Sequence, residues 1–161
     1  MSDEKNYRTD DPTDHLSDYE PVDYTDPVRQ RLAEEPVEAI ACQPCMSVSP
    51  TTTVREAIET LNESEVSSLL VVQDDRLLGI FTERDVLEKV VERYERVAHH
   101  PVEQFMTTDP TIVYSSDPSA AAVAAIAVAG HRHVPVLDLN DKVHGITSPR
   151  RVFEFLDAVA N

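Results

Sequence analysis

The stretch Pro36-Val37-Glu38-Ala39-Ile40 decides the fold, because it returns 65 residues later as Pro101-Val102-Glu103-Gln104-Phe105. A second pair of stretches, Gly79-Ile80-Phe81-Thr82 and Gly145-Ile146-Thr147-Ser148, repeats at an offset of 66 residues. The chain has only three glycines, and two of them fall at this one equivalent position. Two copies are fewer than the roughly three that a solenoid needs to bury a core. We therefore expect the two copies to pack against each other.

Each copy predicts the same order of elements, β-α-β-β-α, from the spacing of its apolar residues. A short helix is expected before the first copy, over residues 28–40. The elements expected in the first copy are an extended segment at 46–48, a helix from about 53 to 64, strands at 69–73 and 77–81, and a helix opened by Thr82. Those expected in the second copy are a strand at 111–114, a helix at 117–129, strands at 133–137 and 142–146, and a helix at 148–159. The predicted fold class is α/β (α+β), with two β-α-β-β-α repeats related by a pseudo-two-fold axis.

This pattern divides the chain into an acidic tail at 1–27, a first repeat with its leading helix at 28–98, and a second repeat at 99–161. The tail is rich in Asp, Thr, Ser and Pro and lacks an apolar period, so we expect it to be disordered. Docking of its scattered apolar residues onto the body is the alternative.

The net charge of −16 comes from 30 acidic and 14 basic side chains, with Lys5, Lys89 and Lys142 as the only lysines. This excess repels phosphates, so nucleic acid and anionic membrane surfaces are not expected as partners. Acid-rich, lysine-poor composition resembles that of salt-accumulating halophiles, where salt screens the repulsion, although an acidic mesophilic protein is the alternative. The chain shows no long apolar run and no secretory pattern, so a cytoplasmic location is expected.

The most specific stretch is Gly79-Ile80-Phe81-Thr82-Glu83-Arg84-Asp85, in which a strand leads into a helix. Residues three apart share one helix face, so the Thr82 hydroxyl and the Asp85 carboxylate lie together. A carboxylate that accepts hydrogen bonds from two neighbouring hydroxyls recognises a ribose diol. Taken alone, however, Thr-x-x-Asp is also a common helix-capping pattern.

The duplicated order, the spacing, the Gly-Ile-Phe-Thr-Glu-Arg-Asp stretch and the second-copy strand Val134-Pro135-Val136 together resemble a pair of cystathionine β-synthase (CBS) domains, a Bateman module. The resemblance covers about Pro36 to Val159. It implies a regulatory protein that binds an adenosyl ligand such as AMP, ADP, ATP or S-adenosylmethionine in clefts between the copies. It also implies a homodimer, and a regulated partner that is a separate, unknown protein. A ligand-free dimerisation scaffold is the alternative.

The resemblance implies two unlike clefts. Its ligand-binding residues at the first cleft are Gly79, Ile80, Thr82, Asp85, His131, Arg132 and His133, with the basic residues facing phosphate. The second, degenerate cleft would join Ser148 and Arg151 to Ser67 and Ser68. Arg151 replaces the aspartate there and can fill the cleft itself, so we expect one nucleotide site per chain.

Cys42-Gln43-Pro44-Cys45 is a C-x-x-C pair that suggests a metal or redox sensor. Redox pairs usually open a helix, and a zinc site needs two further ligands close by, for which His99 and His100 offer only an adjacent pair. Structural cysteines are the favoured interpretation, and no metal is expected. The sequence contains no phosphate-binding glycine loop and no nucleophile motif, so we expect neither an enzyme nor a required cofactor.

Overall fold

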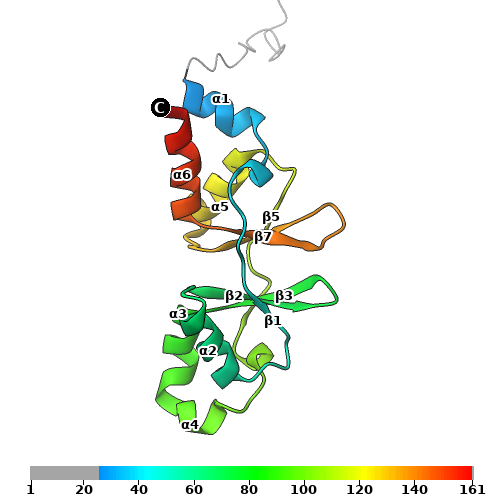
Figure 1. The fold of residues 1–161 in the computed structure, drawn as a ribbon, viewed down its shortest axis with the longest axis vertical. Helices are drawn as coiled ribbons and strands as arrows, with labels where there is room; N and C mark the ends of the chain where they lie inside the picture. The colour runs from blue at the N-terminus through cyan, green and yellow to red at the C-terminus, as the bar shows by residue number, and fades with distance from the viewer. Residues whose placement is uncertain (1–25, 161) are drawn as a thin grey trace, which may run out of the picture.

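The computed structural model describes residues 26–160, so all but the last two residues of the predicted acidic tail lie outside it. Two small sheets are stacked, and each is covered on its outer face by helices (Figure 1). One sheet has four strands in the order β1-β2-β3-β4, and the other has three in the order β5-β6-β7. Within the described part of the chain, no helix is long and apolar enough to cross a bilayer. The mixed α/β class expected from the duplication is confirmed.

The elements of the first half are α1 (Pro27–Glu34), the 3-10 turn η1 (Val37–Ala39), β1 (Ser47–Val48), α2 (Val54–Glu63), β2 (Ser68–Gln73), β3 (Arg76–Thr82), α3 (Glu83–Asp85), η2 (Val86–Val90), η3 (Val91–Arg93) and α4 (Tyr94–Val97). The second half contains η4 (Val102–Gln104), β4 (Thr107–Thr108), β5 (Val113–Tyr114), α5 (Ser119–Ala129), β6 (Val134–Leu137), β7 (Val143–Thr147) and α6 (Pro149–Ala160).

Local sequence explains where the helices begin and end. Thr53 caps α2 in a reciprocal capping box with Glu56, which satisfies backbone donors at the helix start. The helix expected over 28–40 is wrong in its second half, since α1 ends at Glu34. Pro36 is the physical reason, because the residue before a proline is sterically disfavoured in the helical region. Glu35 accordingly has extended backbone angles.

The helix opened by Thr82 also differs from the single continuous helix that the sequence predicts. One short α-turn at α3 is followed by the π-helical turn η2 and the 3-10 turn η3. The backbone then breaks at Arg93, whose angles lie outside the helical region, before α4 begins. The chain therefore passes from β3 to the end of α4 as a series of short helical segments.

The two repeats exchange their leading segments. Val102 and Phe105, which precede the second copy, are buried in the core of the first sheet beside Phe81 and Val54. The equivalent leading segment of the first copy packs against the second sheet, since Val37, Ile40 and Cys42 lie in the core of the second repeat. The leading helix α1 likewise packs against α5 and α6. The ranges 28–98 and 99–161 therefore divide the sequence into its two copies, but each packed core contains residues from both ranges.

The two equivalent glycines mark where the exchanged segments cross the sheets. A Cβ at Gly79 would lie 2.6 Å from the Thr107 carbonyl oxygen, and one at Gly145 would collide with the backbone of Cys42. Both positions therefore require glycine because backbone occupies the space of a side chain.

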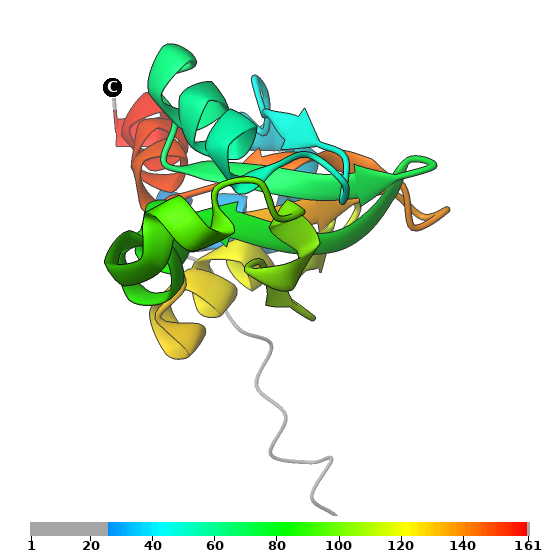
Figure 2. The same ribbon diagram turned by 90° about the horizontal axis from the view of Figure 1, so that it is seen from below.

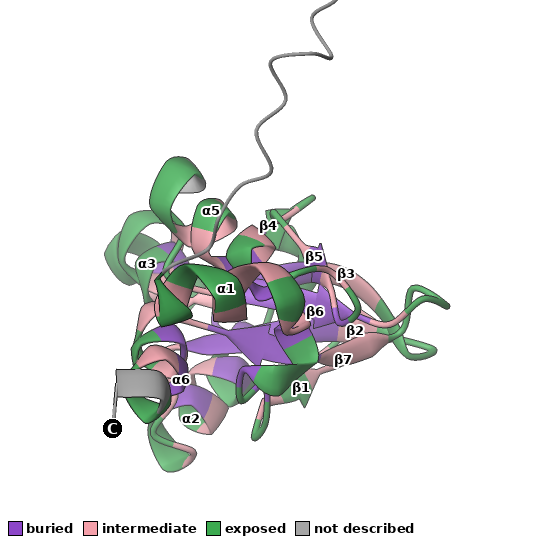
Figure 3. Ribbon diagram, turned by 90° about the horizontal axis from the view of Figure 1, so that it is seen from above, coloured by how far each residue is buried: buried purple, intermediate pink, exposed green. Residues whose placement is uncertain are grey.

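At the end of the sheets away from the starts of α3 and α6, the turns of the two β-hairpins lie side by side (Figures 1 and 2). The ion pairs Arg76–Asp141 and Lys142–Asp75 join them reciprocally, at 3.7 Å and 3.2 Å. The Val143 amide also donates to the Asp75 carbonyl at 3.0 Å. The buried residues lie mainly on the central strands, and the exposed residues lie mainly on the covering helices and the turns (Figure 3). Ile80, Leu70 and Ile146 form the apolar contact between the two sheets.

Candidate functional site

Thr82 and Asp85 form a reciprocal capping box where β3 passes into α3. The Thr82 amide and hydroxyl both donate to Asp85 Oδ2 at 2.9 Å. The Asp85 amide donates back to the Thr82 hydroxyl at 3.3 Å. Asp85 is only 4% exposed although it carries a carboxylate. The predicted proximity of these two side chains is present, and in this structure they also serve as a cap.

Lys89 and Thr107 complete the surroundings of Asp85. The Lys89 ammonium donates to Asp85 Oδ1 at 2.7 Å and to the Phe105 carbonyl at 3.0 Å. The Thr107 hydroxyl, on the exchanged strand β4, donates to the same Asp85 oxygen at 2.9 Å. A buried carboxylate needs such donors because burial removes its water. Asp85 therefore joins the first helix turn to the segment that leads into the second repeat.

Ser67 brings the first repeat into contact with the start of β6. Its carbonyl accepts a hydrogen bond from the Glu83 amide at 3.1 Å, beside Thr82. Its hydroxyl is hydrogen-bonded to His133 Nε2 at 2.9 Å, across the two repeats. His133 thus lies against the residue that neighbours the Thr82 turn. The sequence assigned Ser67 and His133 to different clefts, whereas the structure places them in direct contact at one edge.

Charged groups from both repeats shift the pKa of His133. Burial, and next the guanidinium of Arg132, lower the pKa of His133 below its usual range. Glu83 opposes this lowering of the pKa, and Arg151 adds to it. His131 and Arg132 themselves are exposed and immediately precede β6. The start of β6 therefore carries one permanent cation, Arg132, next to a His133 whose neutral form is favoured.

Arg151 occupies the position of Asp85 in the second repeat. Its guanidinium donates to the Ile146 carbonyl at 2.5 Å and to the Pro44 carbonyl at 2.6 Å. Ser148 precedes α6 and accepts the Val152 amide through its carbonyl. Ser68 is buried in β2, opposite Thr82 in the strand register. The guanidinium is thus already engaged with backbone carbonyls of its own chain.

Gly79 and Ile80 lie further back along β3 than Thr82. Gly79 packs against the exchanged Met106-Thr107 segment, and Ile80 lies between the sheets. Both therefore have structural contacts that the ligand-binding prediction did not include.

The C-x-x-C pair lies in the exchanged segment before β1. Cys42 is buried, and its thiol donates to the Ile40 carbonyl at 3.1 Å, while Cys45 is partly buried. Burial raises the pKa of the Cys42 thiol, with Arg151 acting in the opposite direction. A raised thiol pKa reduces the thiolate fraction that binds metals or attacks disulfides. Within residues 26–160, no three His, Cys, Asp or Glu side chains gather to hold a metal ion.

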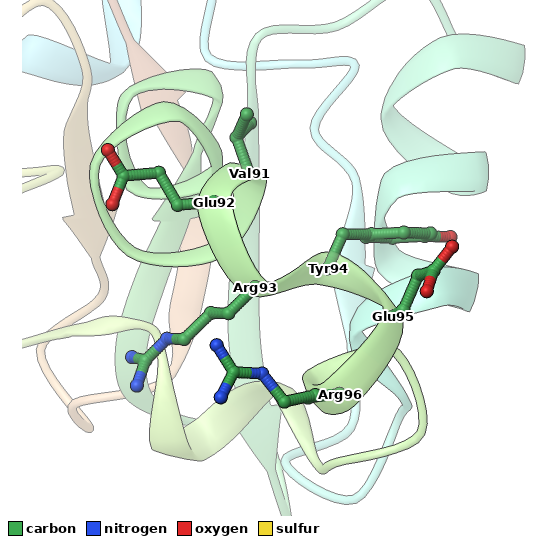
Figure 4. A pocket seen from close by; sticks show the side chains of 6 residues that line it. All are labelled: Val91, Glu92, Arg93, Tyr94, Glu95 and Arg96. Atoms are coloured by element: carbon green, nitrogen blue, oxygen red, sulfur yellow. The ribbon is translucent and has the colours of Figure 1, made fainter.

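An open surface hollow of about 390 Å³ lies elsewhere, at the break between η3 and α4. Its lining is Val91, Glu92, Arg93, Tyr94, Glu95 and Arg96. Figure 4 shows the Arg93 and Arg96 side chains on one side of the ribbon and Glu92 pointing away from Tyr94 and Glu95. None of the residues that the sequence predicts for the site lines this hollow.

Lys89 and Thr107 are the residues near Asp85 that the sequence interpretation missed. Lys89 is four residues after Asp85, a spacing at which opposite charges meet on a helix, so it was detectable. Thr107 comes from the exchanged segment, and no local pattern indicates its approach.

Comparison with known proteins supplies the family context. Two segments of the chain, residues 37–92 and 102–158, match the family model described as CBS domain. A 17.7 kDa protein of Acidianus ambivalens is 33% identical over 115 residues, which are 71% of this chain and 68% of that protein. In CBS domain-containing protein CBSCBSPB1 of Arabidopsis thaliana, the matched region is 28% identical but makes up only 20% of the protein.

Solved structures share the same architecture. CBSX2, solved in complex with AMP, is 25% identical with a TM-score of 0.69 and matches 79% of this chain and 99% of its own. A CBS domain protein of Pyrobaculum aerophilum, complexed with AMP, is 24% identical with a TM-score of 0.67, over 78% of this chain and 98% of its own.

Proposed function

The chain belongs to the CBS domain family as a tandem pair, and we propose that it is a regulatory sensor that binds an adenosyl ligand beside Thr82 and Asp85. The ligand class is AMP, ADP, ATP or S-adenosylmethionine. The sensor acts on a separate partner protein, in the cytoplasm. Binding of AMP by CBSX2, a structural relative at 25% identity, supports this class of ligand.

One observation carries the proposal: the Thr82 turn and the His133 edge meet at Ser67. Ribose hydroxyls are recognised by a carboxylate, and phosphates by cationic donors, so one ligand needs both groups within its own length. Asp85 supplies the carboxylate in the first repeat, Arg132 supplies the cation in the second, and the neighbouring His133 supplies a ring nitrogen that can hydrogen-bond a phosphate. A nucleotide that spans the two repeats would bind both.

The second position is proposed to stay empty of nucleotide. Arg151 stands where a ribose-binding carboxylate is needed, and its donors are directed to the carbonyls of Ile146 and Pro44. A guanidinium has no acceptor to offer a diol. We therefore expect one ligand per chain.

The proposed homodimer uses the exposed apolar side chains on the helices that follow β3 and β7. Leu87, Val91 and Phe153 are exposed, and the segments that carry them, the α3–η3 run and α6, lie on the same side of the molecule (Figures 1 and 2). Exposed apolar patches mark protein interfaces. Leu87→Asp and Phe153→Asp should therefore convert a dimer into a monomer in sedimentation equilibrium.

The test of the ligand proposal is calorimetric titration of AMP, ADP, ATP, NAD, adenosine and S-adenosylmethionine into the full chain and into Asp85→Ala. KCl at about 0.1 M and 2 M covers both the mesophilic and the proposed halophilic setting, since salt screens the acidic surface. Loss of both ribose contacts should weaken binding by about thirtyfold or more. Equal binding by the parent and by Asp85→Ala would refute the site.

A ligand-free scaffold is a second candidate, and the bonding of Asp85 favours it. Thr82, Lys89 and Thr107 satisfy this carboxylate within the chain. If the scaffold is correct, no compound of the panel binds at millimolar concentration, while the dimer persists.

A further inference from the structure

Asp85 is hydrogen-bonded by its own chain at every acceptor position. An ionised carboxylate offers two oxygens with about four lone-pair sites. Oδ2 accepts the Thr82 amide and hydroxyl, both at 2.9 Å. Oδ1 accepts the Lys89 ammonium at 2.7 Å and the Thr107 hydroxyl at 2.9 Å. Two ribose hydroxyls therefore find no free lone pair, and a diol can bind only if present donors leave.

The two carboxylate oxygens of Asp85 differ in how readily their hydrogen-bond partners can leave. The bonds to Oδ2 form the capping box that holds the start of α3. The bonds to Oδ1 come from outside the box, from Lys89 on η2 and from the exposed Thr107 on β4. Losing a cap costs helix stability, whereas an exposed hydroxyl can turn to water. Oδ1 is therefore the oxygen at which partners exchange.

Lys89 can leave without becoming unpaired. Its side chain is 36% exposed, and its ammonium already donates to the carbonyls of Phe105 and Met106, at 3.0 Å and 3.4 Å. An ammonium has three donors, so the two carbonyls and one water satisfy it after it leaves Asp85. The cost of exchange is then one charge-assisted bond and not a buried, unpaired cation.

We propose that Lys89 and Thr107 are affinity-determining residues that compete with the ligand's ribose for Asp85 Oδ1, an inference that rests on the proposed function. Binding replaces the Lys89 and Thr107 bonds with bonds from the ribose hydroxyls. Since both residues connect Asp85 to the 105–107 segment, binding also removes the link between Asp85 and that segment, which Lys89 continues to hold through the Phe105 and Met106 carbonyls. The competition weakens ligand affinity and reports occupancy to the exchanged strand β4.

The test is calorimetric titration of adenosine, which carries the ribose but no phosphate, into Lys89→Met. Lys142→Met is the matched control, because it removes the same charge and an ion pair, with Asp75, at the opposite end of the sheets. Lys89→Met should bind adenosine about threefold to tenfold more tightly, since the charged competitor is gone. Lys142→Met should bind like the parent. Thr107→Val, which removes only a hydroxyl, should tighten binding by about twofold.

Each outcome decides between distinct explanations. Unchanged or weaker adenosine binding by Lys89→Met overturns the competition. Weaker AMP binding with unchanged adenosine binding overturns it too, because Lys89 then serves the phosphate. If Lys89→Met does not fold, Thr107→Val decides, and weaker or unchanged binding refutes the inference. Parent-like adenosine binding by Asp85→Ala instead refutes the proposed function itself, before competition is at issue.

Discussion

The two repeats place opposite chemistry at the same backbone position. In the first repeat, the carboxylate of Asp85 accepts bonds from Thr82, Lys89 and Thr107. In the second, the guanidinium of Arg151 donates to the carbonyls of Ile146 and Pro44. Both side chains contribute to tying a helix start to an exchanged leading segment. Only the acceptor can trade its partners for hydroxyl donors of a ligand, so we propose that the first repeat binds the ligand and the second does not.

The cores of the two repeats differ in a related way. Phe81 is fully buried against the helices of the first repeat, and Thr147 occupies the equivalent, fully buried position in the second. The Thr147 hydroxyl has no hydrogen-bond partner among the described residues. The second repeat therefore carries a destabilising feature that the first lacks.

The largest expected effect is a loss of stability when the crossing of the exchanged leading segments is disturbed. Gly145→Ala and Gly79→Ala place a Cβ against backbone atoms of Cys42 and Thr107, so the crossing segments must move apart. Each substitution should lower the free energy of unfolding by about 3 kcal/mol in urea titrations. Gly130→Ala is the control, because it has open space around it and only a backbone φ of 65° to strain. Its cost should be about 1 kcal/mol. Equal costs at all three glycines would contradict the observed crossings.

The next largest effect is on AMP affinity, and it distinguishes the role of Arg132 from that of Arg151. Arg132→Ala should weaken AMP binding by about tenfold and leave adenosine binding unchanged, because its proposed partner is the phosphate. Arg151→Ala should change AMP affinity little, since its donors are bound to backbone carbonyls. Calorimetry should count about one ligand per chain. Two equal sites, or a larger loss from Arg151→Ala than from Arg132→Ala, would reverse the assignment of the repeats.

A smaller effect tests the unequal cores. Thr147→Val keeps the side-chain shape and removes the unpartnered hydroxyl, so it should raise the free energy of unfolding by about 1 kcal/mol. Ser119→Ala provides the opposite case, because the buried Ser119 hydroxyl donates to the carbonyls of Arg31 and Leu32. That substitution should destabilise the protein. Destabilisation by Thr147→Val would mean that the hydroxyl has a partner.

The sequence predicted the features that depend on local pattern and on the duplication. The helix that begins after Thr53 and the turn at Thr82 follow from short-range hydrogen bonding, and both form where expected. The early end of α1 is also readable from the sequence, because Pro36 disfavours a helical conformation at Glu35. Local chemistry thus accounts for these two starts and for the end of α1.

The exchange of leading segments could not be read from the sequence. A repeat unit looks the same whether Val102 and Phe105 cover their own sheet or the other one. Only the path of the chain in space decides, and that path also brings Thr107 to Asp85 and His133 to Ser67. The sequence therefore named separate clefts from residues that the structure places in contact.

The smallest effect concerns pH and the contact between the repeats. Burial and Arg132 lower the pKa of His133, so the folded protein binds its proton less readily than the unfolded chain. Folding then favours the neutral form of His133. Its contribution to the free energy of unfolding is fully present above the unfolded pKa of about 6.5 and is lost as the pH falls below that value. Urea titrations between about pH 7.5 and 5.5 should show stability falling more steeply in the parent than in His133→Gln. The substitution keeps a hydrogen-bonding side chain near Ser67 but cannot titrate. Identical slopes would show that His133 keeps its ordinary pKa, and that the cationic groups around it, Arg132 and Arg151, are offset by Glu83.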